Sequence, residues 1–373
     1  MFLAECVALA TALREQRTLA GLQACAEWEN LRPRLEQVLS TIRRHQPSLP
    51  PDEPPDPARL MALQWNIEHG NRFEQVLAAL RDHPQLQDAD LLLLQEVDMG
   101  MARSGNRDVA EELGRALYRN AIWAPLFLET TAGRHEDLAQ AGGRENLEAL
   151  FGLAILSRWP IGEARIVELP SPGSIQYDTE GMFGRHIALV AAIERPEAPF
   201  VAVSVHLEVH RSRLDRARQM RALTAALARE RHPIVLGGDF NTSTFDRGRW
   251  WDPLAAGAAL AFQPSLERRL LYPDRGVHRE PLFDALRDAR FEWHPLNDRR
   301  PSLRLRLERL PETRGGLGRV MPNAWIQRME TRAAMRLDWI AVRDWRRGRG
   351  ATVAGLDGPD RASDHAPLLA ELR

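Results

Sequence analysis

The sequence contains no lysine, because every one of its 50 basic residues is an arginine. A chain without lysine has no amine for a Schiff base, so a fixed cation beside a phosphate must be an arginine or a metal ion. Cysteine is nearly absent as well, and the two that occur, Cys6 and Cys25, lie close to the N-terminus. So few cysteines exclude a disulfide framework and favour a reducing compartment, which we take to be the cytoplasm.

Long apolar segments and an excess of one charge are also missing. No uninterrupted apolar run is long enough to cross a bilayer. The first ten residues lack a basic segment and include Glu5, which argues against a signal peptide. The formal net charge of -1 offers no field that would attract nucleic acid or an anionic membrane. With 373 residues and 44% hydrophobic content, the chain can bury one large core or two smaller ones.

Composition divides the chain into three segments. Residues 1–45 carry apolar side chains at helical spacing, which predicts a helical extension of two helices that packs as an accessory. Residues 46–58 are too rich in proline for a helix or a sheet interior, and we expect a linker. Residues 59–373 form the expected catalytic domain. Within it, residues 245–331 are an arginine-rich insertion that either covers a site or lies on the surface, and the sequence leaves both open.

Short apolar runs alternate with amphipathic segments after the linker, as in a domain of mixed strands and helices. We expect helices at 73–81 and 212–229. Strands are expected at 59–65, 91–96, 153–156, 186–192, 201–206, 234–236, 336–342 and 366–371.

The most informative stretch is Pro233-Ile-Val-Leu-Gly-Gly-Asp-Phe-Asn241. It predicts a buried strand that ends at two glycines, which are expected to let the backbone turn. Asp239 and Asn241 then project to the same side, because side chains two residues apart share a face. A carboxylate that can accept a proton and an amide that donates hydrogen bonds suit an attack on a phosphate. Alternatively, both side chains bond their own backbone in an Asx turn.

Other polar side chains also occur where apolar runs end. Ligand and catalytic groups of α/β sheets gather at such strand ends. The residues in question are Asn66, Glu68, Glu96, His206, Asp338, Asp364 and His365. Taken singly, each has a plainer interpretation: a surface carboxylate, a hydrogen-bonded core histidine, a cap, or an ion pair with an arginine. The ordered set is what distinguishes them.

This ordered set resembles the endonuclease/exonuclease/phosphatase superfamily, the deoxyribonuclease I-like phosphoesterases. The motifs are Trp65-Asn66, Gln95-Glu96, Gly152-Leu-Ala-Ile-Leu-Ser157, His206-Leu207, Gly238-Asp-Phe-Asn241, Leu337-Asp-Trp-Ile340 and Ser363-Asp-His365. Each motif is weak to moderate alone, whereas their order is highly specific. The resemblance implies an α+β four-layer sandwich, with two mixed β-sheets face to face, helices outside them and the site at one edge.

The resemblance also implies a divalent metal, Mg²⁺ or Mn²⁺, which oxygen ligands suit. It makes Glu96 the main metal ligand, with Asn66, Glu68 and Asp364 as further contacts. Many relatives carry Asp at the position of Glu68. A second departure is Leu153, where many relatives carry Asn.

Catalytic roles follow from the same resemblance. Asp239 would orient or deprotonate the attacking water, and Asn241 would donate a hydrogen bond to the developing phosphorane. His206 would serve as an acid or a phosphate ligand. His365, steered by Asp338, would contact the phosphate or transfer a proton.

Two arginines are candidate phosphate ligands. Arg185 precedes a strand at a position where many relatives carry Arg, so it either binds the phosphate or lies on the surface. Arg103 follows the Glu96 strand and either reaches the site or only leads into a helix.

The leading hypothesis is a metal-dependent hydrolase of phosphate esters, most simply a phosphodiesterase of the nuclease or lipid type. A phosphomonoesterase of the same family is the first alternative. The second is a non-catalytic interaction protein that keeps the fold and binds a partner with its extension and insertion. Nucleic acid, phospholipid, nucleotide and sugar phosphate all stay open as substrates, although the net charge does not favour nucleic acid. The oligomeric state is not indicated.

Overall fold

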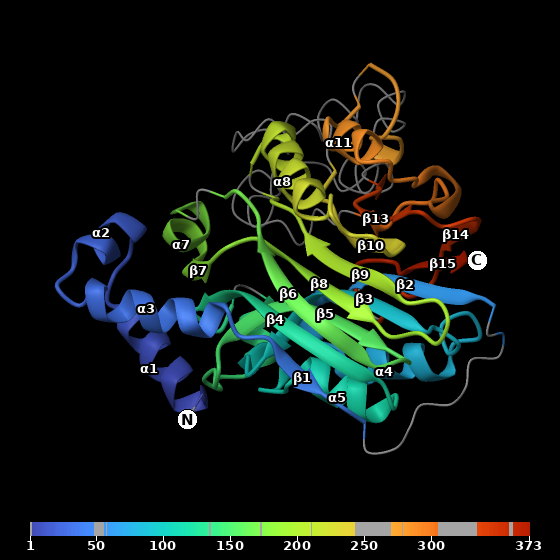
Figure 1. Ribbon diagram of the computed structural model, residues 1–373. Helices are drawn as coiled ribbons and strands as arrows, with labels where there is room; N and C mark the ends of the chain where they lie inside the picture. Colours follow the sequence, from blue (N-terminus) through green and yellow to red (C-terminus); the bar gives the residue numbers. More distant parts are fainter. Residues whose placement is uncertain are drawn as a thin grey trace, which may run out of the picture.

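Two mixed β-sheets pack face to face in the computed structural model (Figure 1). A third, small sheet consists of β11 (Leu303–Arg304) and β12 (Ala334–Met335). The structure describes residues 2–47, 56, 58–133, 136–171, 174–209, 211–242, 270–277, 279–304, 334–357 and 361–373.

The larger sheet has eight strands, of which β2 and β3 run parallel and the other neighbours antiparallel. In spatial order they are β1 (Arg43–His45), β4 (Asn120–Glu129), β5 (Leu150–Ser157), β3 (Leu91–Met99), β2 (Leu60–Asn66), β15 (Leu368–Leu372) and β14 (Gly348–Thr352), with β7 (Met182–Gly184) beside β4.

The second sheet has five strands, with β9 and β10 parallel. In spatial order they are β13 (Asp338–Arg343), β10 (Ile234–Asp239), β9 (Phe200–His206), β8 (Ile187–Ile193) and β6 (Ile161–Glu168).

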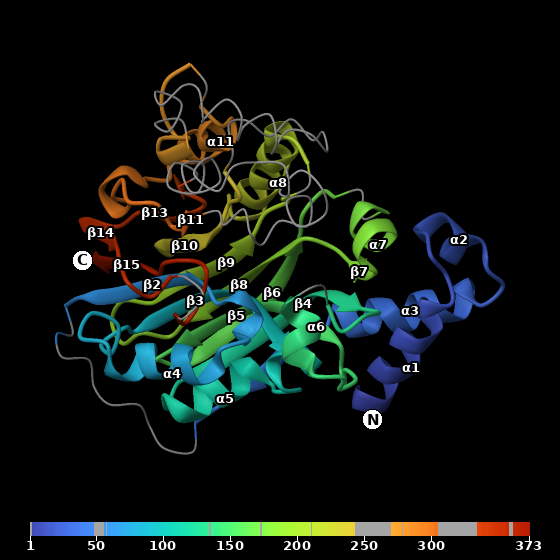
Figure 2. The ribbon, with the colours of Figure 1, turned by 180° about the vertical axis from the view of Figure 1, so that it is seen from behind.

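Helices cover the outer face of each sheet (Figures 1 and 2). α4 (Phe73–Asp82) and α5 (Val109–Ala116) pack on the larger sheet, and α8 (Arg213–Ala226) and α11 (Leu282–Asp288) pack on the second. In the part of the chain that the structure describes, the remaining helices outside the N-terminal segment are η1 (Glu68–Gly70), η2 (Ala102–Ser104), α6 (Glu136–Ala141), α7 (Ser174–Glu180) and η4 (His294–Leu296). The α+β sandwich expected from the sequence is therefore confirmed.

The alternation of side chains along each strand decides which residues lie between the sheets. In β2, Ala62 belongs to the apolar core between the sheets, whereas Leu63 and Trp65 belong to the core on the helix side. Because the period of a strand is two, Gln64 and Asn66 continue the inward row. The space between the sheets is therefore apolar over most of its length and polar where these strands end.

The N-terminal segment differs from the expected pair of helices. Within the described residues it contains three helices, α1 (Phe2–Arg14), α2 (Leu19–Ala24) and α3 (Trp28–Leu39), and it ends in the edge strand β1. Apolar side chains of α1 and α3 join the core on the helix side of the larger sheet. Tyr177 of α7 also donates its hydroxyl to the carbonyl of Leu13 (2.7 Å). Burial and pairing thus join the extension to the sandwich.

The described part of the arginine-rich insertion carries α11, η4 and β11, and the rest of 245–331 lies outside the described residues. Arg216 of α8 forms a fully buried ion pair with Glu280 (2.8 Å), which anchors the segment that leads into α11. Ser302 lies near the strand ends, where its hydroxyl accepts the backbone N–H groups of Leu337 and Asp338. The insertion therefore contributes to the polar edge as well as to the surface.

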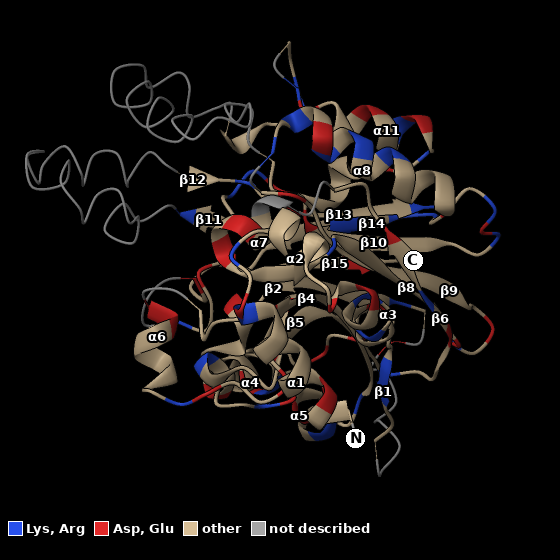
Figure 3. Ribbon diagram, turned by 90° about the vertical axis from the view of Figure 1, so that its left-hand side faces the viewer, with Lys and Arg blue, Asp and Glu red and all other residues tan. Residues whose placement is uncertain are grey.

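Surface charge is mixed. Basic and acidic residues both occur on α8 and α11 in the side view of Figure 3. In the described ranges, every helix is too short or too polar to cross a bilayer.

Candidate active site

The polar ends of five strands meet at one edge between the two sheets. Asp239 at the end of β10 is the register partner of Asp338 at the start of β13 and of His206 at the end of β9. Asn66 and Gln95, from the parallel strands β2 and β3, are likewise register partners. Parallel strands end at the same edge, so residues far apart in the sequence converge here.

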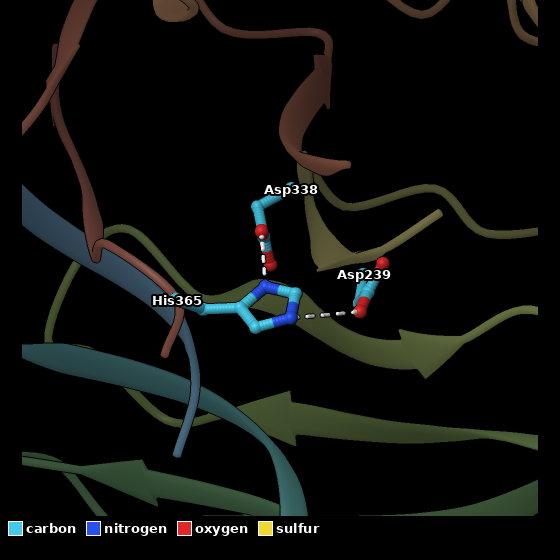
Figure 4. Close-up of side chains that lie close together, drawn as sticks. All are labelled: Asp239, Asp338 and His365. Atoms are coloured by element: carbon cyan, nitrogen blue, oxygen red, sulfur yellow. Dashed lines mark hydrogen bonds and ion pairs between the residues drawn. The ribbon is translucent and has the colours of Figure 1, made fainter. Parts of the chain in front are cut away.

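His365 lies between two aspartates, as Figure 4 shows. Its Nδ1 is 2.7 Å from Asp338 Oδ2, and its Nε2 is 3.8 Å from Asp239 Oδ2. The backbone of His365 is also fixed, because its N–H donates to the hydroxyl of Ser363 (3.1 Å). The indole of Trp65 donates to the carbonyl of His365 (2.8 Å).

The pKa values of His365, Asp338 and Asp239 are shifted in different ways by burial and by neighbouring charges. Burial by itself would lower the pKa of His365, but the Asp338 and Asp364 carboxylates raise that pKa well above its usual value. Burial would raise the pKa of Asp338, yet the imidazole of His365 holds it below its usual value. Burial and the charge of Asp338 raise the pKa of Asp239, despite the two histidines around it. At neutral pH, His365 is therefore charged and paired, and Asp239 is the more basic aspartate.

The two carboxylate oxygens of Asp239 do different things. Oδ1 accepts the backbone N–H of Asn241 (2.9 Å), so the Asx turn weighed from the sequence is present. Oδ2 faces His365, lies 3.7 Å from Nε2 of His206, and accepts a hydrogen bond from Asn66 (3.2 Å). Asn241 has a φ of +49°, and its Nδ2 donates to the carbonyl of Leu207 (2.8 Å). The Asp239 carboxylate thus takes part in the Asx turn with one oxygen and in the site with the other.

The two glycines of the motif do not form the expected turn. Gly237 and Gly238 lie inside β10, and a Cβ at Gly238 would meet the carbonyl oxygen of Val205 at 2.0 Å. A Cβ at Gly237 would meet side chains of the larger sheet. They serve close packing between strands and sheets instead.

Glu96 stands at a β-bulge, where the register of β3 and β5 shifts between Leu94 and Val97. Its φ is +51°, in the left-handed region. Nδ2 of Asn66 donates to Glu96 Oε1 (2.9 Å) and also to Asp239. A bulge re-aims a side chain, and here the Glu96 carboxylate comes to share one amide with Asp239.

His69 is a neighbour of Glu96 that the motifs did not single out. Its φ is +63°, its Nε2 lies 3.4 Å from Glu96 Oε2, and its Nδ1 lies 3.3 Å from Asp98 Oδ1. Burial and Arg103 would lower the pKa of His69, but the two carboxylates raise it to about 9. Burial would raise the pKa of Glu96, whereas His69 and other donors hold it below its usual value. The only signal in the sequence was a histidine three residues after Asn66.

Arg103, a candidate phosphate ligand from the sequence, is instead buried, and it pairs with Asp98. Its side chain is 1% exposed. It donates to both oxygens of Asp98 (2.9 and 2.8 Å) and to both oxygens of Glu129 (3.1 and 2.6 Å). Arg103 thus supports Asp98, which in turn contacts His69.

Glu68 and Asp364, expected as further metal contacts, lie beside Asn66. The backbone N–H of Glu68 donates to Asn66 Oδ1 (3.1 Å), and its carboxylate lies 3.3 Å from the guanidinium of Arg72. Ser363 donates its hydroxyl to the carbonyl of Asn66 (2.7 Å) and lies 3.4 Å from Asp364 Oδ1.

Arg185, the other expected phosphate ligand, is brought to a different place. Its guanidinium pairs with Glu36 of α3, donates to the hydroxyl of Ser40 (3.1 Å), and lies 3.2 Å from Glu168. These contacts tie the junction of β7 and β8 to the N-terminal helices. Among the described residues, the contacts of this guanidinium do not include the Asp239 cluster, and its acidic partners are Glu36 of the extension and Glu168 of β6.

The donor atoms at the edge fit a hard divalent cation. Glu96 is ionised at neutral pH, and the neighbouring Asn66, Glu68 and Asp364 offer only oxygen as ligand atoms, which Mg²⁺ and Mn²⁺ prefer. Ligand atoms of Asp239, Asp338 and His365 also lie within 4.8 Å of one another. In that trio, however, the 2.7 Å contact already joins His365 to Asp338, so a hydrogen-bonded chain describes it better than a metal cage.

Comparisons with known proteins identify the family. The sequence profile of the Endonuclease/Exonuclease/phosphatase family matches residues 63–365. No curated protein matches the sequence.

One solved structure shows the same fold at low identity, and two others are similar over most of this chain. The endonuclease/exonuclease/phosphatase from Bacteroides vulgatus is 14% identical, with 84% of this chain and 98% of that chain covered and a TM-score of 0.50. The one from Beutenbergia cavernae DSM 12333 is 18% identical, with 84% and 71% covered and a TM-score of 0.49. The human Nocturnin catalytic domain with bound sulfate anion is 14% identical, with 90% and 97% covered and a TM-score of 0.46. Because the family profile spans every strand end described above, the chain belongs to the endonuclease/exonuclease/phosphatase family.

Proposed function

We propose that this protein is a divalent-metal-dependent hydrolase of phosphate esters, and that it acts as a phosphodiesterase. One observation carries the proposal: the amide of Asn66 donates both to Glu96 (2.9 Å) and to Asp239 (3.2 Å). A carboxylate suited to a metal and a carboxylate suited to activating water are thereby held side by side. Membership of the family supports the same class of reaction.

Glu96 would hold the metal, with Asn66, Glu68 and Asp364 as further contacts. A bound divalent cation supplies Lewis acidity, which stabilises negative charge on the phosphoryl oxygens. Asp239 would accept a proton from the attacking water. Its raised pKa makes it a stronger base than an ordinary aspartate, and its Oδ2 is the oxygen that faces the site.

Three side chains would contact the phosphate. An amide carries two N–H bonds, and Asn241 uses one of them on Leu207, so the other is the donor for a phosphoryl oxygen. His365, kept charged by Asp338, would hold a second oxygen. His206, near Asp239, would protonate the leaving oxygen or bind the phosphate. Such donors act where charge grows in the transition state.

The charge of the site favours a diester over a monoester. A phosphomonoester carries about 1.5 to 2 negative charges at neutral pH, whereas a diester carries about one. The proposed site contains five carboxylates, Glu68, Glu96, Asp239, Asp338 and Asp364. Apart from the metal ion and His365, these carboxylates repel a dianion more strongly than a monoanion. The free thiols of Cys6 and Cys25 fit the reducing cytoplasm as the place of action.

The test is hydrolysis of bis-p-nitrophenyl phosphate with Mg²⁺ or Mn²⁺, before and after EDTA. We expect EDTA to abolish the activity, and Asp239→Asn to lower kcat by about 10²- to 10⁴-fold, the usual contribution of a general base. The matched control is Asp288→Asn, a carboxylate that is 74% exposed at the end of α11. The monoester p-nitrophenyl phosphate is measured in parallel and should be the poorer substrate.

Full activity of Asp239→Asn would sink the mechanism. Faster hydrolysis of the monoester would make the protein a phosphomonoesterase instead. If the wild-type protein neither binds Mn²⁺ nor hydrolyses a panel of nucleic acids, phospholipids, nucleotides and sugar phosphates, the non-catalytic alternative holds.

A further inference from the structure

We infer that Gln64 is a positioning residue for the proposed hydrolysis: it orients Asp338 for His365, and Gly237 provides the space it needs. The inference rests on the proposed function, in which His365 contacts the phosphate. Gln64 belongs to none of the motifs that carry the family resemblance.

Gln64 projects from β2 into the space between the sheets, where it is fully buried. Its Nε2 donates to Asp338 Oδ1 (2.7 Å) and to Gln95 Oε1 (2.7 Å). Because an amide nitrogen carries two hydrogens, it can serve both acceptors at once. Gln64 thereby connects β2 of one sheet to β13 of the other, at the carboxylate that contacts the imidazole of His365.

The other acceptor of this amide is itself fixed. Gln95 donates its Nε2 to the carbonyl of Leu93 (3.1 Å) and to the hydroxyl of Ser204 (2.9 Å). The same hydroxyl donates to the carbonyl of Leu94 (3.0 Å). With its nitrogen committed in this way, Gln95 must turn its oxygen toward Gln64.

The carbonyl oxygen of Gln64 is the evidence that this orientation serves a purpose. Among the described residues, this buried Oε1 has no hydrogen-bond partner. A buried carbonyl without a partner is costly, and such a group in a native structure calls for an explanation. Turning the amide over would place this oxygen against the oxygens of Asp338 and Gln95, which is worse. The unpartnered oxygen is therefore the cost of giving Asp338 a donor.

Asp338 divides its two oxygens between two donors. Oδ2 lies 2.7 Å from Nδ1 of His365, and Oδ1 takes the amide of Gln64. Ser302 holds the backbone N–H of Asp338 (3.1 Å). With both oxygens engaged, the carboxylate cannot rotate about its bond to the chain, and the imidazole it holds keeps one orientation toward the substrate.

Gly237 explains how so large a side chain fits at this level of the core. It lies in β10 opposite Gln64, and a Cβ there would stand 3.1 Å from Cβ and 3.2 Å from Cγ of Gln64. The same Cβ would stand 2.7 Å from Cδ1 of Leu93. Leu93 must move to relieve the shortest contact, and Gln64 must shift by a few tenths of an ångström, so Gly237→Ala perturbs Gln64 without removing a polar atom.

The test compares Gln64→Met and Gly237→Ala with the exposed control Gln85→Met in the full-length protein. The first readout is the proton NMR resonance of the His365 Nδ1–H, assigned as the signal that His365→Asn removes. We expect this resonance to shift or broaden in both core variants and to stay in place in the control. It needs no turnover, so it tests Gln64 even if the proposed reaction is wrong.

The second readout is kinetic. We expect kcat for bis-p-nitrophenyl phosphate to fall on the order of tenfold, the size expected when a hydrogen bond that orients a reacting group is lost. KM and the affinity for Mn²⁺, measured by isothermal titration, should stay within about twofold, because Gln64 makes no contact with Glu96 or Asn66 among the described bonds. If Gln64→Met fails to fold, Gly237→Ala and Gln64→Asn, whose shorter amide cannot reach both acceptors, decide the question. An unchanged resonance together with an unchanged kcat overturns the inference.

Discussion

Replacing Arg103 with leucine is the sharpest test of what supports the edge proposed to bind the metal. The guanidinium makes four donor contacts to two carboxylates, at 2.9 and 2.8 Å to Asp98 and 3.1 and 2.6 Å to Glu129. The side chains of all three residues are 0–1% exposed. Removing one partner of a buried ion pair typically costs about 3–5 kcal/mol, because a charge is left buried without compensation. Since Arg103 serves two carboxylates, we expect a loss of stability near the upper end, about 5 kcal/mol.

The loss should depend on pH in a defined direction. Without the cation, burial raises the pKa of Glu129 further above its unfolded value, and Asp98 keeps only His69 to oppose the same effect of burial. The folded variant then binds more protons than the unfolded chain, so its stability falls as the pH rises through those folded values. Burial already raises the pKa of Glu129 in the wild type, where Arg103 opposes it. The deficit relative to the wild type should therefore be larger at pH 8 than at pH 5.

Urea unfolding followed by tryptophan fluorescence measures the free energy at both pH values. The control is Arg115→Leu, which removes a surface pair with Glu111 whose side chains are 65% and 35% exposed, and should cost at most about 0.5 kcal/mol. Combining Arg103→Leu with Asp98→Asn and Glu129→Gln should recover part of the loss. A loss below about 1 kcal/mol, or no recovery in the combined variant, would refute the reasoning.

Two smaller predictions concern the N-terminal helices. Arg185→Ala removes the contacts with Glu36 and Ser40, so we expect a lower melting temperature. The value of kcat/KM for bis-p-nitrophenyl phosphate should stay within about twofold of the wild type. A large fall in kcat/KM would show instead that Arg185 contacts the phosphate. Burial raises the pKa of Cys6 to about 12, so at pH 8 we expect Ellman's reagent to modify the half-buried Cys25 quickly and Cys6 only after unfolding in urea. Fast modification of both thiols in the folded protein would show that the helices open readily.

Much of the sandwich could be predicted because strands and helices are encoded by local periodicity. The apolar runs at 91–96, 201–206 and 234–236 correspond to β3, β9 and β10, with differences of a few residues at their ends. The structure of the N-terminal segment was harder to predict from the sequence. Residues 43–45 read as part of a helical extension, yet they pair with β4, and such pairing depends on a partner strand that local sequence does not reveal.

The sequence by itself determined which strands end in polar residues, and the order of those ends was enough to identify the family. Only the tertiary structure decided which other side chains reach them. The bond from Gln64 to Asp338 joins residues 274 positions apart, and Arg185 meets Glu36 across 149 positions. The role of a buried amide or a guanidinium depends on which acceptors the fold brings within about 3 Å, a distance at which hydrogen bonds form. Sequence patterns define faces and ends of elements, whereas these partners exist only once the two sheets have packed together.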